Sequence, residues 1–419
     1  MRNRFGSASK AEARLRAIFG PGYGSDALRP AVADWIERLE FAATGWQLDF
    51  KIGNVNTHPL FRRLYFVVSE FYDNVISEVS RGLLPTQAIE LKELAPPLVT
   101  LSPTRVWGPR TMNGADVEAI CDANVPIVTM PWVYATHPVL WTILSHEVGG
   151  HDVMHALGSH TCGAGAIKDL TEEIAKSFAS VSSVVPSEWV TTWQTWAEEA
   201  IADVFGMLTI GPSFTVNLCA WLSAAKAHDL YGPAVELGTL SGTIYTRFGT
   251  IVGQHSPDLL RLHLAIGVLE ALGQSNVGGW SYWDGALKAI VEDVAVGPNV
   301  LTVYETSSNS TTLQYDASEA CKIAHCVGAH IVNTSLKPIG GRKLSEILKW
   351  TEDDDKIAVQ ISAIVAKGAE GAAAVPAGST SPKLLAGVTM ALYQNVATYE
   401  QATAFLHEVI DGRANALGL

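Results

Sequence analysis

Cysteine is scarce in this chain: there are 5 among 419 residues, an odd number that is spread widely. A disulfide framework needs paired cysteines at close spacing, so this class of protein is excluded. The first residues, Met1–Ser7, lack the apolar core of a secretory signal. A long apolar run is also missing, because Pro131, His137 and Pro138 interrupt residues 126–144. We therefore expect a soluble, cytoplasmic protein.

Positively charged residues are also scarce, because they are fewer than the negatively charged ones. The chain has 29 Lys and Arg against 42 Asp and Glu, which gives a formal net charge of −13. Binding to nucleic acid or to an anionic membrane depends on clustered Lys and Arg, so neither is expected as a partner. Hydrophobic residues make up 48% of the chain and charged residues only 17%. This composition predicts a globular protein with a sizeable core.

The most informative segment that is present is His146-Glu-Val-Gly-Gly-His151, in which Glu147 follows the first histidine. In the usual zinc-peptidase helix, H-E-x-x-H, the histidines are four residues apart and share one face. Here the spacing is one residue longer, and five steps turn about 140° around a regular helix, against about 40° for four. A π-type widening of the turn would absorb the extra residue. Gly149 and Gly150 lie where that distortion is needed, and glycine tolerates it best.

A competing interpretation uses His151 and His155, which have the regular i, i+4 spacing, with His160 nearby. This pair could bind a metal ion without a widened turn, because the two side chains would share a face. No glutamate follows His151, so this set offers no evident general base. We favour His146 and His151 as the ligands, and the alternative stays open at this point.

A second acidic segment, Trp196–Gly206, lies in a stretch with helical periodicity over residues 187–209. Glu199 and Asp203 are four residues apart and therefore share a helix face. One carboxylate can bind a metal ion while the other accepts a hydrogen bond from a ligand imidazole and fixes its tautomer. Glu198 is the other candidate ligand, displaced about 100° around the helix. Without the histidines, a solvated acidic patch would be the ordinary interpretation.

Together the two segments supply a catalytic zinc site of the His₂Glu type, with one coordination position open. The second segment, from Glu199 to Asp203 and Gly206, resembles the glutamate-ligand helix of thermolysin-like gluzincins. The first resembles the expanded H-E-x-x-G-H motif of the dipeptidyl-peptidase III family. The resemblance covers roughly residues 98–265 and is specific over these two motifs.

The resemblance implies one Zn²⁺ per chain, held by His146, His151 and Glu199. It also implies that Glu147 is the general base and that Asp203 is the outer hydrogen-bond partner of a ligand histidine. These roles agree with what the residue types and their spacing predict.

A third element, Gln254–His263, looks like the His-Pro-x-x-x-Arg element of several zincin families, although Ser256 intervenes before its proline. His255 could donate a hydrogen bond to a developing oxyanion, and Arg261 could bind a substrate carboxylate through two parallel hydrogen bonds. The ordinary alternative is a helix N-terminus with Ser256 as its cap and Pro257 in its first turn. That alternative explains the serine and the proline but leaves His255 without a role.

The residues that precede His146 have a pattern that predicts β-structure. Val125–Met130 is short, apolar and β-branched, which indicates a strand, and Leu98–Met112 is also expected to be extended. A strand followed by a metal-binding helix is the zincin arrangement, in which an edge strand binds extended substrate backbone by β-augmentation. The pattern leaves open whether the strand at 125–130 is an edge strand or a central one.

Helical patterns dominate the rest of the chain, so the expected fold class is mainly α (α+β). We expect a zincin-like catalytic core with a small mixed sheet and helical N- and C-terminal regions, divided into residues 1–97, 98–275 and 276–419. The Gly/Ala/Pro/Ser stretch 368–382 predicts a flexible connector. Thr398 and Gln401 predict a capping box for the last helix. A strand pair is expected at 300–315, and helices at 11–19, 27–43, 61–82, 138–157, 187–209, 214–230, 236–252, 258–272, 283–294, 317–331, 343–350 and 355–367.

Two further patterns have ordinary interpretations. Trp189, Trp193 and Trp196 recur at helical spacing and predict a core stripe. The segment Cys321–His330 holds metal-capable residues, but its cysteine spacing is not that of a standard zinc knuckle, so a half-buried helix is expected.

The expected activity is metal-assisted hydrolysis of a peptide or small amide substrate. The metal would polarise the scissile carbonyl and acidify a water molecule, and Glu147 would take the proton of that water. Two alternatives are a zinc-dependent enzyme that acts on a non-peptide small molecule and a zincin-like binding protein with a structural metal. The presence of Glu147 argues against a purely structural metal.

Overall fold

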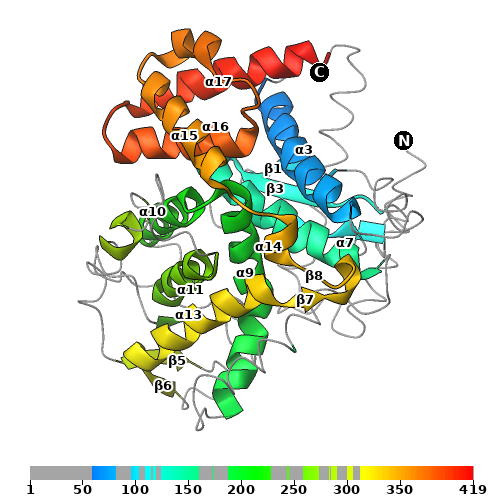
Figure 1. Ribbon diagram of the computed structural model, residues 1–419, viewed down its shortest axis with the longest axis vertical. Helices are drawn as coiled ribbons and strands as arrows, with labels where there is room; N and C mark the ends of the chain where they lie inside the picture. The colour runs from blue at the N-terminus through cyan, green and yellow to red at the C-terminus, as the bar shows by residue number, and fades with distance from the viewer. Residues whose placement is uncertain are drawn as a thin grey trace.

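The computed structural model describes a mainly helical protein (Figure 1). Helices make up 76% of the described residues, and the strands among them form three small sheets, two of which are mixed. The predicted mainly α class with a small mixed sheet is therefore confirmed. The described residues are 59–81, 96–102, 109–114, 117–118, 124–159, 172, 187–227, 243–244, 258–272, 283, 285–289, 300–304 and 312–418.

The first sheet places its three strands in the order β1 (Leu98–Ser102), β3 (Ile127–Pro131) and β2 (Arg110–Met112). β3 runs parallel to β1 and antiparallel to β2. All five residues of β3 are buried, as expected of the apolar, β-branched stretch that predicted it. The strand that precedes the metal segment is thus the central strand. Among the described strands, β2 is the edge strand that contacts that segment.

The chain leaves β3 through the short helices α6 (Trp132–Ala135) and η2 (Pro138–Ile143) and enters the π-helix η3 (His146–Val153) and then α7 (Met154–Ser159). The sequence predicted one helix over 138–157, and the structure divides it into a 3₁₀, a π and an α part. Pro138 occupies the first turn of η2, where its missing N–H costs no hydrogen bond.

Helix α9 (Ser187–Ile210) is the central element of the fold. It packs against the π-helix η3 on one side and against α10 (Ser213–Ala227), α11 (Asp258–Ala271) and α13 (Ala317–Asn333) on others. Figure 1 shows α9 in green through the middle of the molecule. Trp193 and Trp196 are fully buried on α9, so the predicted core stripe is confirmed for these two tryptophans.

The buried apolar side chains form one core that extends from Leu60 on α3 (Pro59–Ser80) to Ala414 on α17 (Tyr399–Ala416). Helix α3, blue in Figure 1, contacts both the π-helix η3 and α17. In the part of the chain that the structure describes, no helix combines the length and the apolar character needed to cross a membrane.

The division of the chain into three regions, with boundaries at residues 97/98 and 275/276, stays a prediction.

The C-terminal helices gather at one end of the molecule, at the top of Figure 1. They are α15 (Glu352–Val365), η5 (Gly368–Ala374), α16 (Ser381–Tyr393) and α17. The prediction of a flexible connector over 368–382 is wrong, because η5 packs against α15 and α17. Gly371 accounts for the close approach: a Cβ there would lie 2.5 Å from the carbonyl oxygen of Ile364. The capping box of Thr398 and Gln401 on α17 is confirmed.

The remaining elements agree with the sequence in most places. The strand pair predicted at 300–315 is the antiparallel pair of β5 (Val300–Tyr304) and β6 (Thr312–Asp316). Within the helix predicted at 236–252 the structure describes only strand β4 (Thr243–Ile244), so that prediction is wrong there. The helices predicted at 11–19 and 27–43 lie outside the described residues. The other short elements are β7 (Ser335–Leu336), η4 (Lys337–Ile339), β8 (Arg342–Lys343) and α14 (Leu344–Ile347).

His407 on α17 makes the stability of this fold depend on pH. Burial and the nearby charge of Arg63 lower its pKa to about 4, against the opposing effect of Asp411. The unfolded chain therefore takes up a proton at His407 near pH 6.5, and the folded chain does so only near pH 4. Stability should fall as the pH falls through this window, by about 1–2 kcal/mol for a partly exposed group.

His407→Phe keeps a ring beside Trp141 and removes the titrating group. Urea unfolding of the wild type and the variant at pH 7 and pH 5 checks the prediction. The wild type should lose more free energy of unfolding than the variant between these pH values. If both proteins lost the same free energy of unfolding, His407 would not contribute to the pH dependence of stability, because the other titrating groups are common to both proteins.

Candidate metal centre

The π-helix η3 carries the two histidines that the sequence predicted as ligands. It covers His146–Val153, and at its end the backbone N–H of Met154 donates to the carbonyl oxygen of Gly149, five residues earlier. The widened turn that the spacing of His146 and His151 predicted is therefore confirmed. It allows both imidazoles to face the same neighbour, helix α9.

The two glycines of η3 serve close packing rather than an unusual backbone conformation. A Cβ on Gly150 would lie 2.2 Å from the Cβ of Ala202, and one on Gly149 would lie 2.7 Å from the ring of Phe205. Neither glycine has a positive φ. We expected them because a distorted turn favours glycine, whereas their physical role is to let α9 approach η3 without an intervening side chain.

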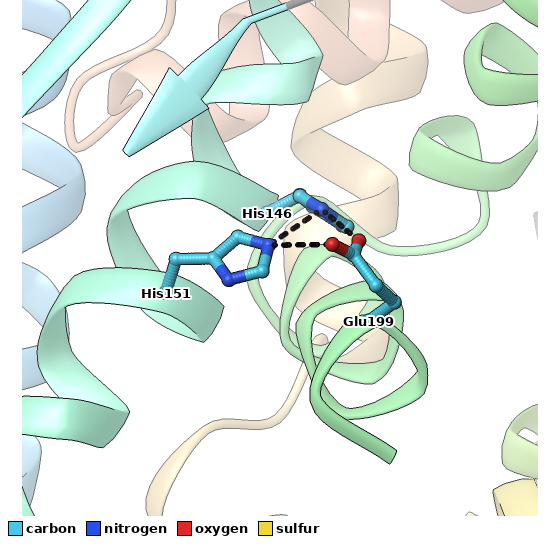
Figure 2. Close-up of side chains that lie close together, drawn as sticks. All are labelled: His146, His151 and Glu199. Carbon is cyan, nitrogen blue, oxygen red and sulfur yellow. Dashed lines mark hydrogen bonds and ion pairs between the residues drawn. The ribbon is translucent and has the colours of Figure 1, made fainter. Parts of the chain in front are cut away.

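His146, His151 and Glu199 converge in the space between the two helices (Figure 2). The Nε2 atom of His146 lies 3.2 Å from Nε2 of His151 and 3.2 Å from Oε2 of Glu199. The Nε2 atom of His151 lies 3.5 Å from Oε1 of Glu199. Two imidazole nitrogens bound to one tetrahedral zinc ion at about 2.0–2.1 Å are about 3.3–3.4 Å apart, so the set fits such an ion.

The competing ligand pair does not converge. His155 places its Nε2 atom 2.8 Å from Oε1 of Glu198 rather than beside Nε2 of His151. Among the described residues, the group of His146, His151 and Glu199 is the one whose ligand atoms lie within 4.8 Å of one another. His160 lies outside the described residues.

Each imidazole of the candidate centre also lies beside a second carboxylate, on the side of its Nδ1 atom. Nδ1 of His146 lies 2.9 Å from Oδ1 of Asp203, and Nδ1 of His151 lies 3.0 Å from Oε1 of Glu198. If each Nδ1 donates to its carboxylate, each Nε2 presents its lone pair to a shared cation. The hydrogen bond predicted between Asp203 and a ligand histidine is thus present, and Glu198 takes the corresponding place at His151.

The surrounding carboxylates make this space attractive to positive charge. Burial alone would lower the pKa of His146, but hydrogen bonds with Asp203 and Glu199 raise it. Burial would likewise lower the pKa of His151, which the charge of Glu199 and a hydrogen bond to Glu198 raise well above its usual value. Protons and a metal ion therefore compete for the same nitrogens.

Arg261 occupies a different place from the one expected of a substrate-binding residue. It is buried on α11, and its Nε and Nη2 donate to Oδ2 and Oδ1 of Asp203, both at 2.6 Å. The arginine therefore lies behind the metal ligands, with its guanidinium group engaged by a carboxylate of the protein. His255, the other residue of that predicted element, lies outside the described residues.

Glu147 is buried beside the ligands and is held by a residue that the sequence analysis did not identify. The hydroxyl of Thr111, on edge strand β2, lies 2.7 Å from Oε2 of Glu147 and 3.1 Å from its backbone oxygen. Phe214 on α10 was also missed; its ring stacks on His146, with centroids 6.2 Å apart. No spacing rule connects either residue to the motif, because each comes from a separate element.

Comparisons of this chain with protein-family models, curated proteins and solved structures find no match. The two imidazoles and the carboxylate on their own define the class of site, a candidate transition-metal centre. Imidazole and carboxylate ligands suit Zn²⁺ and its neighbours in the first transition series.

Gly150→Ala should disrupt the centre, because its methyl group would push α9 and Glu199 away from the two histidines. We expect at least a ~10-fold loss of Zn²⁺ affinity, and overpacking should reduce the free energy of unfolding by about 1–3 kcal/mol. Competition with a chromophoric chelator and urea unfolding measure the two effects.

Gly412→Ala is the matched control, since Gly412 is exposed in α17 and a Cβ there meets nothing within 4 Å. This variant should keep its Zn²⁺ affinity and gain stability, by about 1 kcal/mol at most. Unchanged metal affinity in Gly150→Ala would show that the spacing of the two helices does not control the centre.

Proposed function

We propose that this protein is a zinc-dependent hydrolase of the gluzincin type, and that it cleaves peptide bonds. The observation that carries the proposal is the convergence of His146, His151 and Glu199, with Glu147 buried on the same π-helix as the two histidines. A structural zinc site closes its coordination with four protein ligands, whereas three ligands beside a buried glutamate are typical of a catalytic one.

Nε2 of His146, Nε2 of His151 and the Glu199 carboxylate would hold the ion. When bound, zinc supplies a Lewis acid that polarises the substrate carbonyl and lowers the pKa of water. Asp203 and Glu198 hold the two imidazoles in the tautomer that presents Nε2 forward. The ring of Phe214 lies nearly parallel to the His146 ring, with centroids 6.2 Å apart.

Glu147 is the proposed general base. A water molecule adds to the substrate carbonyl, and the carboxylate takes the proton of that water and later gives it to the leaving nitrogen. The hydroxyl of Thr111 donates to Oε2 of Glu147 and so fixes the orientation of the carboxylate. Strand β2 thereby orients the base with respect to the proposed ligands.

The edge strand β2 supports a peptide as the substrate. It contacts the π-helix, and in the described part of the chain it pairs on one side only, with β3. An extended backbone could add to its other side through main-chain hydrogen bonds, which is the ordinary way in which a sheet edge binds a peptide. Thr111 at the centre of β2 would then connect the bound backbone to the base.

Metal content tests the ligand set. The wild type should bind one Zn²⁺ per chain, and His151→Ala should lose most of it, because it removes one of the three ligands. His155→Ala is the matched control, since His155 contacts Glu198 and not the converging atoms. Mass-spectrometric metal analysis after dialysis measures both variants: metal kept in His151→Ala would contradict the proposed ligand set, and metal lost in His155→Ala would return the site to the competing interpretation, in which His151 and His155 are both ligands.

The base is tested by Glu147→Gln, which keeps the shape of the side chain and cannot accept the proton. Peptide hydrolysis should fall at least on the order of 10²-fold while one Zn²⁺ stays bound. A library of short peptides, followed by mass spectrometry, measures the cleavage. Glu370→Gln, at an exposed position on η5, is the control and should cleave like the wild type. Wild-type cleavage by Glu147→Gln would remove Glu147 as the base.

The wild type also tests the substrate class. Cleavage of peptides in this library supports a metallopeptidase. If the zinc-loaded wild type leaves every peptide intact, the proposed peptide substrate is wrong, and a non-peptide amide takes its place as the candidate.

A further inference from the structure

Arg261 and Asp203 form a charged pair in the interior, directly behind the metal ligands. Their side chains are 6% and 5% exposed, and the guanidinium makes two parallel hydrogen bonds of 2.6 Å to the carboxylate. A fork of this kind fixes the plane of the carboxylate as well as its position. The pair also joins α11 to α9 at the turn of α9 that follows Glu199.

One oxygen of Asp203 connects the arginine to the ligand. Oδ1 accepts from Nη2 of Arg261 and lies 2.9 Å from Nδ1 of His146, while Oδ2 accepts from Nε of the arginine. The orientation of the fork therefore determines the direction in which Oδ1 faces the imidazole. His146 is only 3% exposed, so bulk water has little access to its ring.

We propose that Arg261 is a positioning residue of the metal centre: through the Asp203 carboxylate it sets the orientation of the His146 imidazole, and so the affinity of the centre for zinc. This inference rests on the proposed function, because it assumes that His146 binds the ion. It replaces the role in substrate binding that the sequence suggested for Arg261.

His151, the other histidine of the centre, has no equivalent buried arginine–carboxylate pair among the described residues, and it serves as an internal comparison. Its carboxylate partner, Glu198, is 42% exposed and shares Oε1 between His151 and His155. Exposed side chains lose more conformational freedom when they are fixed, so Glu198 holds His151 less rigidly than the buried fork holds His146. The buried side of the centre is therefore the more firmly held, because Arg261 fixes Asp203 and Asp203 in turn holds His146.

Arg261→Lys tests the proposal because lysine keeps the positive charge and loses the two-pronged geometry. We expect Zn²⁺ affinity to fall on the order of 10–100-fold, the effect of disturbing an outer hydrogen-bond partner of a metal ligand. Chelator competition measures the affinity. The visible spectrum of the Co²⁺-substituted protein should also change in Arg261→Lys, because that spectrum reports ligand geometry.

Arg63→Lys is the matched control. Arg63 also holds a carboxylate with two hydrogen bonds, from Nε and Nη2 to Asp411, and joins α3 to α17 away from the metal ligands. It should lower the free energy of unfolding of the metal-free protein and leave the Zn²⁺ affinity and the Co²⁺ spectrum unchanged. A purely structural role for Arg261 predicts the same pattern in Arg261→Lys.

The outcomes separate the inference from the proposed function. If the wild type binds no Zn²⁺, the proposed function fails. If it binds Zn²⁺ and folded Arg261→Lys binds it within 2-fold of the wild type, the inference about Arg261 is overturned. Should Arg261→Lys fail to fold, Arg261→Ala with added methylguanidinium replaces it: recovery of Zn²⁺ affinity with the added cation supports the inference, and recovery of the fold without the affinity overturns it.

Discussion

The approach of the π-helix to α9 is the constraint on which the rest of the metal centre depends. Ala202 of α9 lies where a side chain on Gly150 would have to be, so the two backbones are almost in contact. At this separation Glu199, three residues before Ala202, reaches the histidines, and Asp203, one residue after it, reaches the back of His146. A side chain at position 150 would push α9 away from the π-helix and so separate the candidate ligands.

The charges around the centre form a graded arrangement from interior to surface. Asp203 is buried and neutralised by Arg261; burial would raise its pKa, and the arginine lowers it to about 2. Glu198 is half exposed, and hydrogen bonds with His151 and His155 lower its pKa to about 2 as well. Both carboxylates therefore stay ionised at neutral pH behind the imidazoles. Burying this much negative charge is unfavourable without cations, which Arg261 supplies in part and a metal ion would complete.

The sequence predicted those features that depend on local spacing. The five-residue interval between His146 and His151 required a widened turn, and Glu199 with Asp203 required a shared helix face. Features set by contacts between distant elements could not be predicted in this way. The partner of Arg261, the central place of β3 and the hydroxyl of Thr111 on Glu147 all depend on how separate segments pack. The flexible connector predicted for the Gly/Ala-rich stretch 368–374 was wrong for the same reason. Small residues allow close packing between helices as readily as they allow flexibility, and only the packing of η5 against α15 and α17 decides between the two.

The ligands come from two segments of the chain that the fold alone brings together. In the unfolded chain His151 and Glu199 are separated by a long, fluctuating loop, so an ion held by all three side chains binds the folded form almost exclusively. Binding of this kind raises the free energy of unfolding by RT ln(1 + [M]/Kd), in which [M] is the free metal concentration. Under the proposed function, the stability of this protein is therefore a property of the chain together with the metal in its solution, and two preparations can be compared only at a fixed free metal concentration.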